Sequence, residues 1–381
     1  MQGLSFIDTF LPLWILLCMV GGVLIGYYVP SVEQVLNAAQ FADVSLPIAI
    51  GLLFMMYPVF CRIKYEELLR LLQGSFIRRQ ILFSLIINWI VAPLLMVALA
   101  WMTLPDLPGY RSGVILVGVA RCIAMVLIWN HLAGGNQEFG ALTVAINSLL
   151  QMVLYGPLSY FYVVILGQGS QIKIDMWTIV RSVLIYMGIP LAAGYMTRVA
   201  LRRYEWYHKQ FLELMDKLSL VSLLYIILLM FALQGREIIH DIGNVLRTAV
   251  PLVLYFFGIF TSVLAWCYRT RVPFDIAVAQ CFTASSNNFE LAIAVAVGTF
   301  GVQSKEALAA TIGPLTEVPM LVSLVYFTKY AHRRWYGPRE QAAISDAVGA
   351  GSLTTMPVIT SDIEKHQDEA NLPIPRGNND Q

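Results

Sequence analysis

Ten apolar stretches follow one another along this 381-residue chain, separated by short polar connections. Each can cross the hydrocarbon core of a bilayer, which needs about 20 apolar residues. One such stretch could equally be a buried helix of a soluble protein, but ten in succession are not compatible with that fold. The predicted spans are 10–29, 42–61, 79–102, 112–133, 139–167, 176–198, 217–234, 248–268, 273–300 and 306–329. The sequence therefore predicts an all-α polytopic membrane protein.

Basic residues predict the orientation of these spans. They follow the even-numbered spans and are scarce in the other connections, and cytoplasmic loops are the ones enriched in Lys and Arg. The residues concerned are Arg62, Lys64, Arg70, Arg78, Arg79, Arg198, Arg202, Arg203, Lys209, Lys217, Arg269, Arg271, Lys329, Arg333, Arg334 and Arg339. We therefore expect a multi-pass protein of the plasma membrane with both termini in the cytoplasm.

The sequence also contains an internal repeat. A shift of 166 residues aligns 135–161 with 301–327, with nine of 27 positions identical. Five spans per half would give the halves opposite membrane orientation, as in the inverted repeats of secondary transporters. This predicts a first five-helix repeat over 1–175, a second, inverted repeat over 176–335, and a disordered cytoplasmic tail over 336–381, which is polar and has no long apolar run.

An arginine and a cysteine lie side by side inside the fourth predicted span, as Arg121 and Cys122. A charge in hydrocarbon costs several kcal/mol unless it is paired or faces a wet cavity. Arg121 could pair with an acidic residue of another span, or its charge could favour the Cys122 thiolate, and the two roles are compatible. The other four cysteines are scattered in apolar surroundings, where buried thiols are common.

A run of small and polar residues, TASSNN at 283–288, interrupts the ninth span. Such a run could serve a tight helix contact, but the adjacent Asn287 and Asn288 favour an unwound, water-lined segment at the bilayer midplane. The 166-residue shift places Cys122 on Asn288, so we expect a matching break in the fourth span. We therefore predict discontinuous, crossed helices four and nine.

Two carboxylates lie in the same half of the chain. Glu317 lies between Pro314 and Pro319 in the tenth span, and Glu290 follows the polar run of the ninth. Burial favours the neutral form of an acid, so such a group can load and release a proton. Either carboxylate could instead be a structural partner of Arg121. We predict proton coupling by Glu317, with Glu290 as the weaker candidate.

Asn147 and Gln151 lie one helical turn apart in the fifth span and share a face. They could join neighbouring helices, but this spacing favours the lining of a binding site. The sequence contains no phosphate-binding loop, no HExxH motif and no acidic cluster. We therefore expect no enzymatic activity, no cofactor and no nucleic-acid partner, and the sequence identifies no protein partner.

The stretches ARCIAMVLIWNHLAGGN (120–136) and GPLTEVP (313–319) resemble the arsenical-resistance permeases, arsenite carriers related to the bile-acid/sodium symporters. The resemblance covers 5–335 and implies export of As(III), often Sb(III), in exchange for protons. It implies that Cys122 is the thiolate ligand of As(III) and that Glu317 is the acidic residue of the tenth helix. The binding site would be completed by polar residues of the fourth, fifth and ninth spans, namely Arg121, Asn147, Gln151, Asn287 and Asn288. The soft As(III) centre favours a soft sulfur ligand.

Two other functions are open to this sequence. Asn287 and Asn288 resemble the place where sodium-coupled relatives bind cations, so the chain could be a sodium-coupled carrier of an organic anion. It could also be a membrane sensor that shares the fold without transport. Sodium dependence and the direction of flux distinguish the first alternative, and loss of metalloid resistance on deletion argues against the second.

Overall fold

The computed structural model describes residues 11–29, 31–41, 44–62, 74–123, 125–167, 176–301, 303–339 and 341. It divides into two compact units, Met1–Thr328 and Lys329–Gln381. In the second unit, the described part contains the last residues of a long helix and the π-helical segment His332–Tyr336. The predicted tail, 336–381, lies almost entirely outside the described residues.

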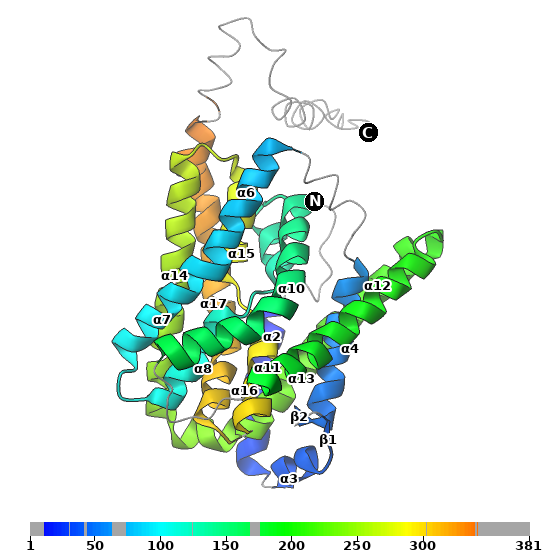
Figure 1. Ribbon diagram of the computed structural model, residues 1–381, viewed down its shortest axis with the longest axis vertical. Coiled ribbons are helices and arrows are strands. Elements are labelled where there is room, and N and C mark those ends of the chain that lie inside the picture. Colours follow the sequence, from blue (N-terminus) through cyan, green and yellow to red (C-terminus); the bar gives the residue numbers. More distant parts are fainter. Residues whose placement is uncertain are drawn as a thin grey trace, which may run out of the picture. The chain divides into compact units, whose positions relative to one another are not determined.

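The described residues of the first unit are helical almost throughout (Figure 1). The α-helices are α2 (Leu11–Tyr28), α3 (Ser31–Asn37), α4 (Leu46–Arg62), α6 (Ser75–Ile86), α7 (Ala92–Thr103), α8 (Pro108–Val119), α9 (Met125–Leu132), α10 (Gln137–Tyr160), α11 (Met176–Val183), α12 (Ile189–Leu201), α13 (Leu212–His240), α14 (Ile242–Arg269), α15 (Phe274–Ser285), α16 (Phe289–Phe300) and α17 (Lys305–Ala331). Two short antiparallel strands, β1 (Gln40–Phe41) and β2 (Val44–Ser45), precede α4.

π-Helical segments extend or join several of these helices. They are η1 (Ile87–Val91), η2 (Phe161–Leu166), η3 (Leu184–Gly188) and η4 (Tyr207–Phe211). η1 continues α6 into α7, and η3 continues α11 into α12, so each pair forms one uninterrupted helix. A π turn inside a helix shifts the faces of its two halves without ending it.

Within the described residues, six helices are long and apolar enough to cross a membrane by length and composition: Ser75–Thr103, Gln137–Leu166, Ile179–Leu201, Tyr207–His240, Ile242–Arg269 and Lys305–Arg339. Shorter apolar helices cover Leu13–Tyr28, Leu46–Arg62 and Phe289–Phe300. These findings confirm the prediction of an all-α polytopic membrane protein, apart from the two short strands. The arrangement as ten spans in inverted repeats stays a prediction.

The helices pack in two sets. α13 packs against α2 and α4, and α4 also packs against α12; Figure 1 shows α4, α12 and α13 alongside one another. In the second set, α14 packs against α7 and α15, while α8 contacts α7, α14 and α16. The second set brings both of the predicted discontinuous spans next to α14.

Two glycines allow α17 to approach this second set closely. A Cβ on Gly313 would lie 1.8 Å from the ring of Phe289, the first residue of α16. A Cβ on Gly113 would lie 2.4 Å from the backbone oxygen of Glu306. Only glycine permits these contacts, so α17 passes directly beside α8 and the start of α16.

Candidate functional site

The predicted fourth and ninth spans are both interrupted. α8 ends at Val119 and α9 begins at Met125, while α15 ends at Ser285 and α16 begins at Phe289. The C-cap residues that follow α8 and α15, Ala120 and Ser286, both have extended backbone. Each interruption leaves backbone N–H and C=O groups without helical partners. We call the two interruptions, at 120–123 and 286–288, the crossing.

The two interruptions bond to each other at the crossing. Arg121 and Asn287 form an isolated antiparallel bridge, and the Asn288 N–H donates to the Ala120 carbonyl at 3.2 Å. The side-chain amide of Asn287 also donates to the carbonyls of Val117 and Ala120, at 2.9 and 3.0 Å. The crossing therefore satisfies in pairs many of the groups that the breaks expose.

Asn288 is the N-cap of α16, the residue directly before its first helical residue. Its Oδ1 accepts from the backbone N–H of Leu291 at 3.0 Å, the usual bond of an asparagine N-cap. One atom of each asparagine is left over. Among the described residues, Asn287 Oδ1 and Asn288 Nδ2 have no hydrogen-bond partner, although these side chains are only 1% and 2% exposed. Buried polar atoms usually have a partner, so these two are candidates for binding a solute.

Arg121 is buried, and its side chain folds back over the end of its own helix. The guanidinium donates to the carbonyls of Gly118 and Val119 and to the Tyr255 hydroxyl, the last at 3.2 Å. Cations are stabilised at the C-terminal end of a helix, where the carbonyls carry partial negative charge. Within the described segments Arg121 forms no ion pair, so the alternative that pairs it with Glu290 or Glu317 is not observed.

Glu317 of α17 reaches the ninth-span break. It is buried, and its Oε1 accepts from the Ser286 hydroxyl at 2.6 Å. Cys122 lies close enough to Ser286 and Glu317 to interact electrostatically with both. Ser286 therefore brings together the predicted thiol and the predicted acid, from spans far apart in the sequence.

Sequence reasoning missed Ser286 as an individual residue. The signal was present, because Ser286 belongs to the small and polar run at 283–288, but nothing in that run distinguishes it from Ser285. In the structure Ser285 bonds to the Cys281 carbonyl of its own helix, whereas Ser286 lies past the helix end and faces Glu317.

The remaining candidates lie at different distances from this centre. Glu290 is half-buried in the first turn of α16, near enough to Glu317 for the two charges to repel. Gln151 Oε1 accepts from the Arg121 backbone N–H, and its amide donates to Met187 Sδ. Asn147 is held by Trp89, whose Nε1 donates to Asn147 Oδ1 at 3.1 Å. Gln151 therefore contacts the crossing directly, whereas Asn147 is hydrogen-bonded to a residue of η1.

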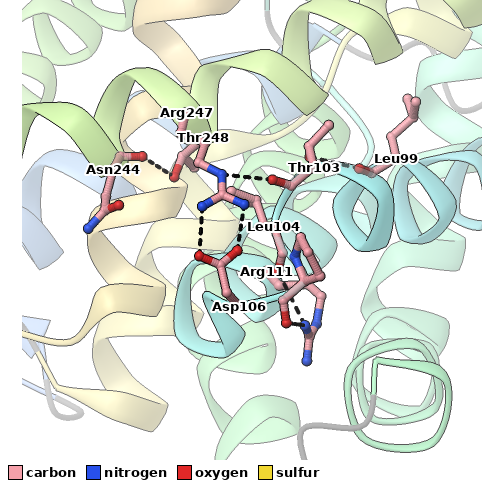
Figure 2. Close-up of polar contacts among 9 residues, drawn as sticks. Leu99, Thr103, Leu104, Asp106, Arg111, Asn244, Arg247 and Thr248 are labelled. Carbon is pink, nitrogen blue, oxygen red and sulfur yellow. Dashed lines mark hydrogen bonds and ion pairs between the residues drawn. The ribbon is translucent and has the colours of Figure 1, made fainter.

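A second polar cluster lies where the ends of α7, α8, α14 and α17 meet; we call it the helix-end network. Arg247 forms a two-pronged ion pair with Asp106 and also donates to the Thr103 carbonyl (Figure 2). The bond from Arg247 holds the pKa of Asp106 below its usual value. Asp241 accepts from the Tyr110 hydroxyl and from Lys305, and the Tyr110 bond is the main cause of its lowered pKa.

The crossing offers a single thiol. Among the described residues no three His, Cys, Asp or Glu side chains gather as a metal-binding group, and the five cysteines are all free. Its chemistry therefore consists of one soft sulfur, one buried carboxylate and several amides. Such a set can bind a small neutral solute reversibly.

Comparison with known proteins assigns the class of this site. Residues 49–241, about half of the chain, match the Sodium Bile acid symporter family. The chain is 34% identical over 348 residues to an uncharacterized transporter of Synechocystis sp., covering 86% of this chain and 89% of that protein. These matches define a membrane transporter and not an enzyme.

Two further relatives narrow the assignment. The chain is 42% identical over 344 residues to the arsenical-resistance protein Acr3 of Corynebacterium glutamicum, covering 88% of this chain and 91% of that protein. It is 30% identical over 348 residues to the Acr3 protein of Alkaliphilus metalliredigens, covering 88% and 95%. The chain belongs to the Sodium Bile acid symporter family and, within it, to the arsenical-resistance permeases.

Proposed function

We propose that this chain exports As(III), and also Sb(III), from the cytoplasm in exchange for protons. The observation that carries the proposal is the meeting of Cys122 and Glu317 at Ser286, inside the crossing. The names of the relatives support the choice of cargo, since two of them are arsenical-resistance proteins.

The chemistry of As(III) suits a single thiol. Arsenite in neutral water is an uncharged hydroxide with a soft, thiol-seeking centre. On binding, the sulfur lone pair of Cys122 forms an S–As bond, one As–OH bond breaks, and the hydroxide leaves with the thiol proton as water. Release is the reverse: water adds to arsenic, the S–As bond breaks, and a proton returns to sulfur. Arg121 contributes through its charge, which favours the thiolate.

The amides of the crossing fit the remaining hydroxyls of bound arsenite. Asn287 Oδ1 can accept from one As–OH, and Asn288 Nδ2 can donate to another. Neither atom has a partner within the part of the chain that the structure describes, and Asn147 Nδ2 is a further donor of the same kind there. In this proposal Gln151 holds the Arg121 backbone in place and touches the cargo less directly.

Glu317 couples export to protons in this proposal. It takes up a proton from outside and gives it up inside, while arsenite moves the other way. Glu290 assists through its charge, because it disfavours two ionised carboxylates at once. Burial of Glu317 and its bond from Ser286 support this role.

The helix bounds support an inverted-repeat architecture with repeats over 1–175 and 176–335. Adding 166 to the bounds of α8, 108–119, gives 274–285, the bounds of α15. Adding it to 75–103, the extent of α6, η1 and α7, gives 241–269, against 242–269 for α14. Arg121 and Asn287, which form the bridge, are related by the same shift. The proposal includes cytoplasmic termini and a plasma-membrane location, on the charge pattern alone.

Everted membrane vesicles test the function. We expect wild-type vesicles to accumulate arsenite when a pH gradient is imposed, and a sodium gradient alone to drive nothing. The family match supports one competitor, a sodium-coupled carrier of an organic anion. Sodium-driven movement of an organic anion such as a bile acid, with no arsenite flux under a pH gradient, would establish that competitor instead.

A further inference from the structure

Tyr255 of α14 connects the two halves of the crossing. Its hydroxyl accepts from Arg121 Nη1 at 3.2 Å and donates to the Ala284 carbonyl at 3.1 Å. Ala284 lies in the last turn of α15, just before the ninth-span break. A phenol has one proton and two lone pairs, so donation to Ala284 leaves it free to accept from the guanidinium. One hydroxyl therefore bonds to both interrupted helices.

The neighbouring residue of α14 continues this support. Phe256 packs against Phe289, the first residue of α16, with ring centroids 6.4 Å apart. Tyr255 and Phe256 are both fully buried. α14 is itself an unbroken helix from Ile242 to Arg269. A rigid helix thus contacts the end of α15, the start of α16 and the arginine that follows α8.

Among the described residues, Tyr255 is the one hydrogen-bond partner of the Arg121 side chain outside α8. The other hydrogen bonds of the Arg121 side chain go to Gly118 and Val119, in the last turn of α8. Cys122 follows Arg121 directly, in a stretch without helical hydrogen bonds to fix its position. The hydrogen bonds that fix Arg121 therefore also restrict the position of the Cys122 thiol.

We propose that Tyr255 is a positioning residue of the transport site, which acts through Arg121 to fix the Cys122 thiol opposite Ser286 and Glu317. This rests on the proposed function to the extent that Cys122 binds the cargo. Without the hydroxyl, the guanidinium loses its tertiary bond and the segment at 120–123 opens more readily. The thiol should then become more accessible, and the site should bind arsenite less well.

The first test needs no arsenite. In a chain whose other four cysteines are replaced by alanine, Cys122 is alkylated with N-ethylmaleimide in detergent. Tyr255→Phe should raise the alkylation rate about tenfold, the usual effect of losing one hydrogen bond to a charged group. Tyr207→Phe is the matched control, since that fully buried hydroxyl donates to the Cys61 carbonyl at 2.6 Å, and among the described residues no contact links it to Arg121. Its rate should change less than about twofold.

A double-mutant cycle tests whether Tyr255 acts through Arg121. In an Arg121→Met background, Tyr255→Phe should change the alkylation rate by less than about threefold, because the bond that it removes is already gone. Equal effects of Tyr255→Phe in both backgrounds would overturn the inference, as would equal rates for Tyr255→Phe and Tyr207→Phe.

Transport kinetics complete the test. In everted vesicles we expect Tyr255→Phe to raise the KM for arsenite about tenfold and to lower the maximal rate less. A fall in maximal rate with unchanged KM would contradict a positioning role. If the alkylation results hold while wild-type vesicles carry no arsenite, the proposed function fails and the positioning of Cys122 by Tyr255 stands.

Discussion

The crossing and the helix-end network both hold charged side chains, but they neutralise them differently. In the helix-end network each charge meets an opposite charge near the surface: Arg247 pairs with Asp106, with side chains 40% and 58% exposed, and Lys305 pairs with Asp241. At the crossing, buried Arg121 is bonded to carbonyls and a hydroxyl, and buried Glu317 accepts from a hydroxyl. Neither forms an ion pair within the part of the chain that the structure describes.

This difference separates two uses of charge. An exposed ion pair costs little to form and is worth about 1 kcal/mol or less, so it serves to align helix ends. A buried charge held by neutral groups is expensive, and it keeps its freedom to exchange a proton or respond to a ligand. We therefore expect changes at the crossing to affect transport strongly and changes in the helix-end network to affect stability weakly.

The largest effect is expected from Glu317→Gln. Glutamine keeps the size of the side chain but cannot take up or release a proton, so pH-gradient-driven arsenite flux should fall to about a tenth or less. Glu306, a buried carboxylate in the first turn of α17, gives the matched control Glu306→Gln, which should keep most of the flux. Flux in both variants can be measured in everted vesicles. Unchanged pH-driven flux in Glu317→Gln would remove the proton role.

The second-largest effect is expected from Arg121→Met, which should lower the stability of the folded protein. Methionine keeps much of the apolar stem but leaves the carbonyls of Gly118 and Val119 and the Tyr255 hydroxyl without their donor. The cost should be about 2 kcal/mol. Thermal unfolding in detergent measures it as a lower Tm. A Tm equal to or above that of wild type would contradict this expectation. It would show that burying the guanidinium costs at least as much free energy as its hydrogen bonds contribute.

Acid should weaken the helix-end network through Asp241. Its pKa is lowered in the folded state, first by the Tyr110 hydroxyl and then by Lys305. A lowered pKa gives stability above the ordinary aspartate value, about 3.9, and that stability is lost as pH falls through the folded pKa. Asp241→Asn should therefore flatten the decline of Tm below about pH 4. An acid limb identical to wild type would contradict this contribution.

The smallest effect is expected from Asp106→Asn. It removes the charge that Arg247 meets at the surface, which should cost about 1 kcal/mol or less and leave arsenite flux within about twofold. Tm and vesicle flux of the same variant measure both quantities. A loss of flux comparable to that of Glu317→Gln would erase the contrast between the two regions.

The sequence predicts the helices of this fold better than their ends. The stretch 217–234 lies within α13, which extends over Leu212–His240, and 248–268 lies within α14, Ile242–Arg269. Hydropathy detects the apolar part of a helix, whereas its ends are set by caps and polar flanks. The break at 286–288 was predictable, because six small or polar residues cannot form a lipid-facing stretch. The break after Val119 was predictable only through the repeat.

The contacts at the crossing were less predictable. The sequence singled out Cys122 and Glu317, but it could not tell that Ser286 bonds to Glu317 and lies near Cys122. It could not place the guanidinium of Arg121 either, since a long side chain with five donors can reach many partners. Tyr255 gave no signal at all, because in sequence it is one more aromatic residue of an apolar span. Side-chain partners across helices depend on tertiary packing that periodicity does not encode.

The most direct test of the central claim is arsenite flux in Cys122→Ala. Everted vesicles with equal amounts of wild type, Cys122→Ala and Cys267→Ala are compared under one pH gradient. Cys267 is a buried thiol of α14 that no recorded contact links to the crossing, so it controls for loss of a buried sulfur. We expect Cys122→Ala to lose arsenite accumulation and Cys267→Ala to keep it. Undiminished accumulation in Cys122→Ala would show that the Cys122 thiol does not bind the transported arsenite.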